Sequence, residues 1–369
     1  MIHFKLAELR KRKGLTQQEL AEILGVSHQT ISRWETGAVL PDVSILPQIS
    51  MYFDVSVDAL LGLVPLDPAY IPSKTGMEEY WDNKLEYLEN SRASMWNTDY
   101  ARFLVQEVWK IKKPAAVLDC GCGYGELGRL LLPLLPSGSK YVGIDFSEKL
   151  IRAARKLFHN TDMDVQFLRA DIMKYRPKET YDLVIGQGLL RHPDSGELML
   201  RRMAGFLREG GLLVSIECNR ELETSGLYIH GMDYFRLSDH EGLKKLWKKE
   251  LEEQNRDYAV AMKVPHYMKA MGLKNVSSRM NDRVTFLEPE QPDFKKRLEC
   301  IVKAEGWDKG KTDAEISDLI AFFMNHGMSR KDAEDYCGKQ REIAEYIKSH
   351  KERVSMTMTK GFLISYGWK

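Results

Sequence analysis

The sequence has no long hydrophobic run. Its longest apolar stretches, such as residues 130–135, are far shorter than the roughly 20 residues that a membrane-spanning helix needs. The first residues, Met1 to Lys5, lack the apolar core of a secretory signal peptide. We therefore expect a cytoplasmic protein with no membrane partner.

Cysteine is scarce, and neither sign of charge is in excess. The five cysteines, at positions 120, 122, 218, 300 and 337, are odd in number and scattered, so they imply no disulfide framework. Cys120 and Cys122 are close enough for a metal site, but we expect them to fill a glycine-rich turn, with no metal. The net charge of +1 argues against an extensive nucleic-acid surface. With 369 residues, 43% of them hydrophobic, the chain can form two or three domains.

Residues 117–126 are the stretch around which the chain is organised. An apolar run ends in Asp119 and is followed by three glycines at alternate positions and then by a helical leucine pattern, which predicts a strand, a tight turn and a helix. Such a turn lets a ligand approach the backbone, and the helix start favours a carboxylate or phosphate. A second strand, residues 141–145, ends in Asp145, whose carboxylate could accept both hydroxyls of a ribose.

Two cofactors fit a nucleoside with an anionic end. Gly123, Gly125 and Gly128 satisfy G-x-G-x-x-G, so NAD is possible. Residues 119–125, however, read D-x-G-x-G-x-G, which resembles the first motif of class I AdoMet-dependent methyltransferases. Three later stretches resemble the family's next motifs in the same order: residues 168–172, 181–186 and 207–214. The resemblance favours AdoMet.

This resemblance implies an α/β fold, a seven-stranded Rossmann-like methyltransferase sheet with helical insertions. It also implies that AdoMet is held at the glycine turn, the end of the second strand, and the positions after the third and fourth strands. The implied residues are Asp119, Gly121, Cys122, Gly123, Tyr124, Gly125, Asp145, Phe146, Ser147, Asp171, Ile172, Gln187 and Gly188.

Residues 1–62 form a separate small all-α module. Thr16 and Glu19 predict a capping box at one helix start, and Gly25 and Ser27 end that helix and begin the next. The stretch resembles the Cro/C1-type (XRE) helix-turn-helix domain from end to end, which implies a DNA operator as partner. The expected DNA-binding residues are Gln17, His28, Gln29, Ser32 and Arg33.

The module's charge limits how it can bind DNA. It has six Lys/Arg and seven Asp/Glu, a net charge of −1, so attraction to phosphates must come from the local cluster of residues 10–13. We therefore expect tight binding only as a homodimer. A protein-interaction remnant is the alternative interpretation of this module.

Residues 63–113 are expected to form a linker and an aromatic-rich helical cap. Aromatic residues at helical spacing usually fill a core, yet in this family a helix before the first strand often lies over the pocket. Both interpretations are open for the candidate lid residues Tyr80, Trp81, Trp96 and Tyr100.

Residues 114–369 are expected to form the methyltransferase domain. Residues 265–273 resemble the family's last core helix and residues 283–287 its sixth strand, and residues 354–366 fit its antiparallel seventh strand. Insertions at 219–264 and 288–350 should sit over the active site, because both leave strand carboxyl ends, either as a substrate lid or as a dimer surface.

Candidate catalytic groups follow the fourth and fifth strands. His192 and Glu217 could act as bases, although His192 could equally be a structural turn residue. Asn219 is a candidate substrate residue. Tyr228, His230, Tyr234 and Phe235 could wall a pocket that holds a cationic amine with the help of Glu217 and Asp233.

DNA is not the expected methyl acceptor. No N/D-P-P-Y/F motif is present, residues 186–189 read Gly-Gln-Gly-Leu instead, and no cysteine follows a proline. The first hypothesis is a small-molecule methyltransferase tethered to a sequence-specific DNA-binding domain. The alternative is a transcription regulator whose methyltransferase-like domain senses AdoMet or a metabolite without turnover.

Overall fold

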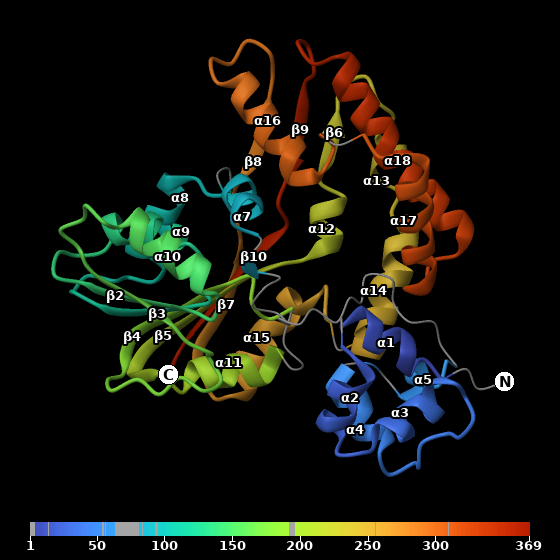
Figure 1. The fold of residues 1–369 in the computed structure, drawn as a ribbon. Helices are drawn as coiled ribbons and strands as arrows, with labels where there is room; N and C mark the ends of the chain where they lie inside the picture. Colours follow the sequence, from blue (N-terminus) through green and yellow to red (C-terminus); the bar gives the residue numbers. More distant parts are fainter. Residues whose placement is uncertain are drawn as a thin grey trace.

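The computed structural model describes residues 4–13, 15–53, 55, 57–62, 81–82, 84–92, 95–191, 196–254, 256–308 and 310–369. The chain has a helical N-terminal unit, a central sheet and a lobe built from segments that follow two strands of that sheet (Figure 1). In the described part of the chain, no helix is both long and apolar enough to cross a membrane.

The N-terminal unit consists of short helices: α1 (Leu6–Arg12), α2 (Gln17–Leu24), α3 (His28–Glu35), α4 (Leu46–Phe53) and α5 (Val57–Leu60). As the sequence predicts, Thr16 forms a capping box with Glu19 at the start of α2, and Ser27 caps α3. All of these helices contribute apolar side chains to one buried cluster, in which Ile31 and Trp34 anchor α3. This cluster fixes which face of α3 remains exposed.

A seven-stranded sheet in the order β3-β2-β1-β4-β5-β10-β7 forms the centre of the molecule. β10 runs antiparallel to both of its neighbours, and the other pairs are parallel. The predicted α/β sheet is therefore confirmed. The strands are β1 (Ala116–Cys120), β2 (Lys140–Asp145), β3 (Asp164–Arg169), β4 (Tyr181–Gln187), β5 (Leu207–Cys218), β7 (Lys274–Met280) and β10 (Phe362–Trp368).

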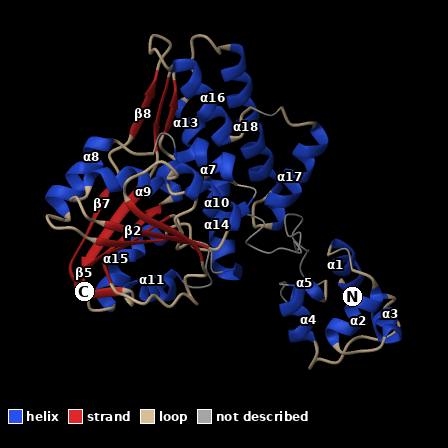
Figure 2. Cartoon of the chain, turned by 60° about the vertical axis from the view of Figure 1, so that its left-hand side comes forward, coloured by secondary structure: helices blue, strands red, loops and turns tan. Residues whose placement is uncertain are grey.

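Helices cover both faces of this sheet (Figures 1 and 2). Leu104, Leu127 and Ile151 belong to the apolar cluster on one face, and Leu200 and Val264 to the cluster on the other. The first face carries α8 (Thr98–Phe103) with a π-helical turn at Leu104–Val108, α9 (Glu126–Leu131) with a 3-10 turn at Leu132–Leu134, and α10 (Glu148–Leu157); the second carries α11 (Gly196–Ala204) and α15 (Val260–Ala270). The carboxyl-end edge of the strands stays free for a site.

The segments after β5 and β7 fold together into the lobe. The first contains α12 (Arg220–Thr224), β6 (Leu227–Ile229), α13 (Tyr234–Ser238) and α14 (Glu241–Gln254); the second contains β8 (Val284–Leu287), α16 (Phe294–Glu305), α17 (Asp313–Asn325), α18 (Arg330–Ser349) and β9 (Met356–Thr359). A three-stranded sheet in the order β6-β9-β8 packs one side against α16 and α18. The lobe therefore has an apolar core of its own.

The prediction of the sixth sheet strand at 283–287 is wrong, because those residues form β8 of the lobe. The strand beside β10 is β7, whose largely exposed, polar residues give little strand signal. Residues 284–287 alternate between exposed and buried, which is the stronger pattern. The predicted seventh-strand stretch is divided between β9 and β10, and the last core helix begins earlier than predicted, at Val260.

Candidate functional site

A cavity of about 490 Å³ opens at the carboxyl ends of β1, β2 and β4, where the strand order reverses. Most of the residues predicted to hold a cofactor line it: Asp119, Gly121, Cys122, Gly123, Tyr124, Asp145, Phe146, Asp171, Ile172, Gln187 and Gly188. The two others, Gly125 and Ser147, are the N-caps of α9 and α10. The structure thus brings the predicted set to one place.

Asp145 ends β2 beside the glycine turn. Its carboxylate accepts hydrogen bonds from the backbone N–H of Gly123 at 3.0 Å and of Ser147 at 2.9 Å. Burial raises the pKa of Asp145, and these backbone hydrogen bonds oppose the shift. Because the two N–H groups fix the carboxylate, its remaining lone pairs are held ready for the hydroxyls of a ligand.

Asp119 lies at the floor of the cavity and accepts a hydrogen bond from the hydroxyl of Tyr141. Burial raises the pKa of Asp119 to about 7, the Tyr141 hydrogen bond opposes this, and the charge of Asp145 adds to it. Among the described lining residues, four are acidic and only Arg92 is cationic. This lining suits a positively charged nucleoside such as AdoMet and disfavours the pyrophosphate of NAD.

The turn after β1 needs glycine. Gly121 has φ of 69°, and a Cβ there would collide with the side chain of Leu189. Cys120 and Cys122 pack into the apolar clusters of opposite sheet faces, so the two thiols share no site. The turn therefore brings its backbone N–H groups to the cavity, while its cysteines fill space.

Residues 81–82 and 84–92, which include α7 (Leu85–Arg92), contribute to the wall of the cavity. Asp82 accepts a hydrogen bond from the Ser147 hydroxyl at 2.5 Å, and Trp81, Leu88 and Arg92 line the cavity. Trp81 was predicted from the sequence as a candidate lid residue. No sequence signal predicted a role at the cavity for Asp82, Leu88 and Arg92, because their polar and apolar pattern is that of an ordinary amphipathic helix.

The other aromatic candidates of the helical cap lie outside the cavity lining. The indole N–H of Trp96 donates to Gln187 Oε1 at 3.1 Å, and the hydroxyl of Tyr100 donates to the backbone carbonyl of Met280 at 2.9 Å. Both rings pack against the central apolar cluster. Trp96 thus orients a cavity residue, whereas Tyr100 packs. Tyr80 lies outside the described residues.

Glu217 sits behind the loop that follows β4. It is buried, and its Oε1 accepts hydrogen bonds from the backbone N–H of Leu189 at 3.0 Å and of Leu190 at 3.1 Å. It does not line the cavity, so the geometry supports positioning of this loop. His192 lies outside the described residues. The catalytic roles of both residues remain predictions.

Glu217 should make stability depend on pH. Burial raises its pKa to about 7, against the backbone hydrogen bonds from Leu190 and Leu189, whereas an unfolded Glu titrates at about 4.3. Between these values the folded chain keeps a proton that the unfolded chain has lost, so stability falls as pH rises through this window and levels off above about 7. We expect the free energy of unfolding of Glu217→Gln, measured with urea at about pH 5, 6 and 7, to fall less steeply with pH than that of wild type. Part of the pH dependence should remain, because burial also raises the pKa of Asp119. An unchanged slope would contradict the assignment.

The predicted substrate residues of the first insertion are not at the cavity. Asn219 caps α12 through a hydrogen bond from the N–H of Leu222, and Asp233 caps α13. Tyr228 and Tyr234 lie on the lobe with ring centroids 6.5 Å apart, His230 lies beside Tyr228, and Phe235 is 80% exposed. These aromatic residues lie beside one another on the lobe, outside the lining of the cavity, and their role in holding a substrate stays a prediction.

The predicted DNA-reading residues share one face of α3. His28, Gln29 and Arg33 are exposed and Ser32 is half-buried, while Ile31 and Trp34 point into the core. This is the arrangement expected of a helix that meets base edges.

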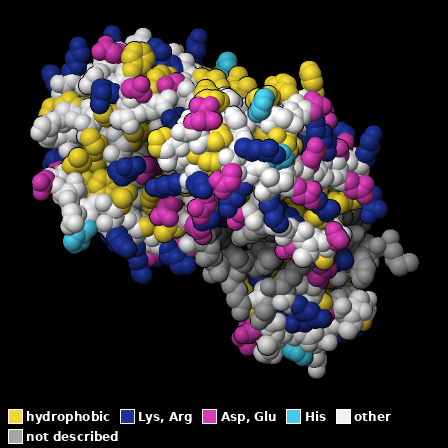
Figure 3. Space-filling view, turned by 90° about the horizontal axis from the view of Figure 1, so that it is seen from above, with side chains coloured by type: hydrophobic (Ala, Val, Ile, Leu, Met, Phe, Trp, Pro, Cys, Tyr) yellow, Lys and Arg dark blue, Asp and Glu magenta, His cyan; other side chains and the backbone are white. Residues whose placement is uncertain are grey.

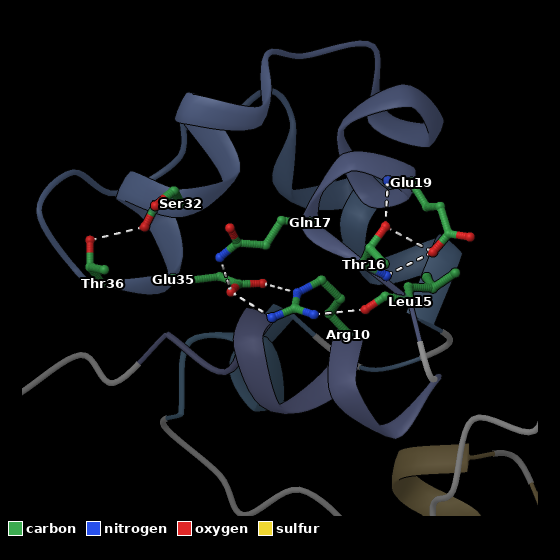
Figure 4. A network of polar contacts seen from close by, with 8 residues as sticks. All are labelled: Arg10, Leu15, Thr16, Gln17, Glu19, Ser32, Glu35 and Thr36. Atoms are coloured by element: carbon green, nitrogen blue, oxygen red, sulfur yellow. Dashed lines mark hydrogen bonds and ion pairs between the residues drawn. The ribbon is translucent and has the colours of Figure 1, made fainter.

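A polar network holds α1, α2 and α3 together (Figure 4). Glu35 accepts hydrogen bonds from Arg10 Nε at 2.5 Å and Nη2 at 3.0 Å, and from the amide of Gln17 at 2.8 Å. Lys13 donates to the carbonyl of Tyr52 at 2.6 Å. The predicted basic cluster of residues 10–13 is thus partly engaged within the unit, and Gln17 has an internal partner.

Charges of both signs are interspersed on the face of the molecule that Figure 3 shows. On the face shown in Figure 3, basic and acidic side chains alternate across the coloured residues, without a continuous basic stretch. This face gives no electrostatic basis for wrapping nucleic acid.

Comparisons with known proteins agree with the two-part chain. Residues 6–60 match the helix-turn-helix family model, and residues 117–211 match a methyltransferase domain model. A ubiquinone biosynthesis O-methyltransferase from Bradyrhizobium diazoefficiens is 30% identical over 118 residues, which cover 32% of this chain and 46% of that protein. The HTH-type transcriptional activator BcrR of Enterococcus faecalis is 49% identical over 57 residues, 15% of this chain and 28% of that protein.

Solved structures are similar to part of this chain at low sequence identity. One is a Haemonchus contortus phosphoethanolamine N-methyltransferase 2 in complex with S-adenosyl-L-methionine, with a TM-score of 0.44 and 15% sequence identity. The match covers 79% of this chain and 59% of the Haemonchus chain. The YcgJ protein of Bacillus subtilis has a TM-score of 0.41 at 14% identity, covering 73% and 98%.

The chain thus contains a helix-turn-helix domain at residues 6–60 and a methyltransferase domain at residues 117–211. It spans less than half the length of the curated methyltransferase quoted above.

Proposed function

We propose that this chain transfers a methyl group from AdoMet to a small molecule and that its helix-turn-helix domain directs it to a DNA operator. The single observation that carries the proposal is the cavity at the strand switch point, with Asp145 fixed beside the glycine turn. When bound, AdoMet supplies a methyl group on a sulfonium, whose sulfur takes the bonding electrons as the acceptor forms the new bond.

The residues of the chain would bind and orient. Asp145 would accept the ribose hydroxyls, the glycine turn would leave space for the methionine chain, and Asp171 would lie at the adenine end of the cavity. Glu217 would hold the loop after β4, where the acceptor must approach, and Trp96 would orient Gln187. Holding the acceptor and the methyl group in line for reaction is the main contribution that a protein makes to methyl transfer.

The size and cover of the cavity favour a small acceptor. A volume of about 490 Å³ is in the range of small-molecule sites, and Trp81, Leu88 and Arg92 form part of its wall. A base flipped out of duplex DNA would also need recognition groups, and residues 186–189 contain no such set.

A labelling experiment tests the proposed acceptor class. The chain is incubated with methyl-labelled AdoMet and an ultrafiltered cell extract, and separately with the macromolecular fraction or with DNA. We expect label in a small molecule. Label in DNA or protein alone would contradict the proposed acceptor class while leaving methyl transfer intact.

Arg33 should contribute to operator recognition. It is exposed on the reading face of α3, so Arg33→Ala should cost about 1–3 kcal/mol of binding if Arg33 contacts a base and should relax preference at one position. Selected DNA should show a near-palindrome with half-sites about one helical turn apart, bound by a dimer. Footprints of a single asymmetric site bound by monomer would contradict this.

A further inference from the structure

Arg92 is the one cation among the described residues that line the cavity. It ends α7, its side chain is half-buried, and it forms part of the cavity wall. Its side chain donates a hydrogen bond to the sulfur of Met95 at 3.5 Å and lies 6.0 Å from the ring centroid of Phe362. Within the described residues, no carboxylate forms an ion pair with it.

The nearby acids are already engaged. Glu126 pairs with Arg129, Asp145 accepts two backbone hydrogen bonds, and Asp119 accepts the Tyr141 hydroxyl. Beyond the lining, Glu223 pairs with Arg220. Burial lowers the pKa of Arg92, and the charges of the surrounding groups only partly oppose this shift. A cation that is partly removed from water and has no counter-ion is unfavourable, so an anionic group on a ligand would stabilise this guanidinium.

The position of Arg92 separates it from the ribose end of the cavity. Leu88 lies over the glycine turn, with its Cδ1 at 3.9 Å from the Cβ position of Gly123. Arg92 follows four residues later, about 6 Å along the helix axis. There its Nη2 lies 3.3 Å from the Cβ position of Gly188, at the end of β4. Since β4 lies on the other side of β1 from β2, which ends in Asp145, Arg92 lies away from the ribose end, at the loop after β4 where the proposed function puts the acceptor.

Gly188 keeps the space beside the guanidinium open. Its φ is 69°, and a side chain there would press against Nη2. The planar guanidinium can donate two parallel hydrogen bonds, which matches the oxygens of a carboxylate or phosphate.

We propose that Arg92 binds a carboxylate or phosphate of the methyl acceptor, which makes the acceptor an acid and not a cationic amine. The anionic group is held and does not react, and the nucleophile lies elsewhere on the acceptor. This inference rests on the proposed methyltransferase function and names the substrate class for the same cavity.

The first test separates the small-molecule extract on an anion-exchange resin. Bound and unbound fractions are each incubated with wild-type chain and methyl-labelled AdoMet. We expect label only with the bound, anionic fraction. Label from the unbound fraction alone would overturn the proposal and leave methyl transfer standing. Label from neither fraction, with AdoMet bound, would contradict the proposed function itself.

The second test uses Arg92→Ala and Arg92→Lys, with Arg102→Ala as the matched control because Arg102 is exposed on α8. Calorimetry measures AdoMet affinity, and labelling measures the amount of anionic fraction needed for half-maximal rate. For Arg92→Ala we expect AdoMet affinity within about threefold of wild type and the half-saturating amount raised at least about tenfold, with partial recovery in Arg92→Lys.

The opposite pattern would overturn the proposal. If Arg92→Ala weakens AdoMet binding at least about tenfold and, at saturating AdoMet, leaves the half-saturating amount of acceptor unchanged, Arg92 holds the carboxylate of the cofactor. Thermal unfolding distinguishes both patterns from misfolding, and a variant that melts early is replaced by Arg92→Lys in the same comparison. If Arg92→Lys matches wild type in both measurements while Arg92→Ala weakens both equally, the side chain only supports the cavity wall, and the proposal fails.

Discussion

Asp145→Ala should weaken AdoMet binding about a hundredfold or more. The carboxylate is fixed by the N–H groups of Gly123 and Ser147, and two charge-assisted hydrogen bonds to ribose hydroxyls contribute about 1.5–3 kcal/mol each. The substitution also leaves both N–H groups without this acceptor. Isothermal calorimetry with AdoMet and with S-adenosylhomocysteine measures the loss.

Two variants make this result specific. Asp145→Asn keeps one acceptor oxygen and should lie between wild type and alanine, while Asp164→Ala, on the exposed start of β3, should bind AdoMet like wild type. If Asp145→Ala binds AdoMet as tightly as wild type, or if the wild-type chain prefers NADH, the assignment of this carboxylate is wrong.

Glu35→Ala should cost the helix-turn-helix domain most of its stability. The Arg10 and Glu35 side chains are only 13% and 6% exposed, and removing one partner of a buried ion pair costs about 3–5 kcal/mol. The same change leaves the Gln17 amide without its acceptor. We expect a separate, early unfolding transition and loss of operator binding at temperatures where wild type binds.

The effect should depend on pH. Burial opposes ionisation of Glu35, but the hydrogen bonds from Arg10 and Gln17 outweigh it and lower its pKa. The stabilisation is therefore present above the unfolded value of about 4.3 and is lost as pH falls through the folded value, so variant and wild type should converge in acid. Glu22→Ala, on the exposed side of α2, is the control and should shift stability by less than about 0.5 kcal/mol. Equal stability of Glu35→Ala and wild type near neutral pH would refute the role of the pair.

Local sequence signals predicted much of this molecule. Three features act through the backbone within a few residues: the capping box of Thr16, the alternate glycines after Asp119 and the acid at the end of β2. Because these contacts are local, the sequence pattern predicts the local geometry. The order of strands and helices then places these turns along one sheet edge.

Long-range packing could not be predicted from the sequence. Nothing local shows that the segments after β5 and β7 share one small sheet, and the alternating pattern of β8 led to the misplaced sixth strand. The aromatic residues near Tyr228 looked like pocket walls but lie on the lobe surface. The place of Arg92 in the cavity wall could not be predicted, because the sequence alone does not show whether an arginine lines a cavity or faces water.

Counting S-adenosylhomocysteine formed per chain tests the central claim most directly. The chain is supplied with excess AdoMet and the small-molecule fraction of an extract, and product is followed with time for wild type and for Asp145→Ala. We predict many equivalents of S-adenosylhomocysteine from wild type and little from the variant. Tight binding of AdoMet with less than one equivalent of product would contradict the account and support a sensor that works without turnover.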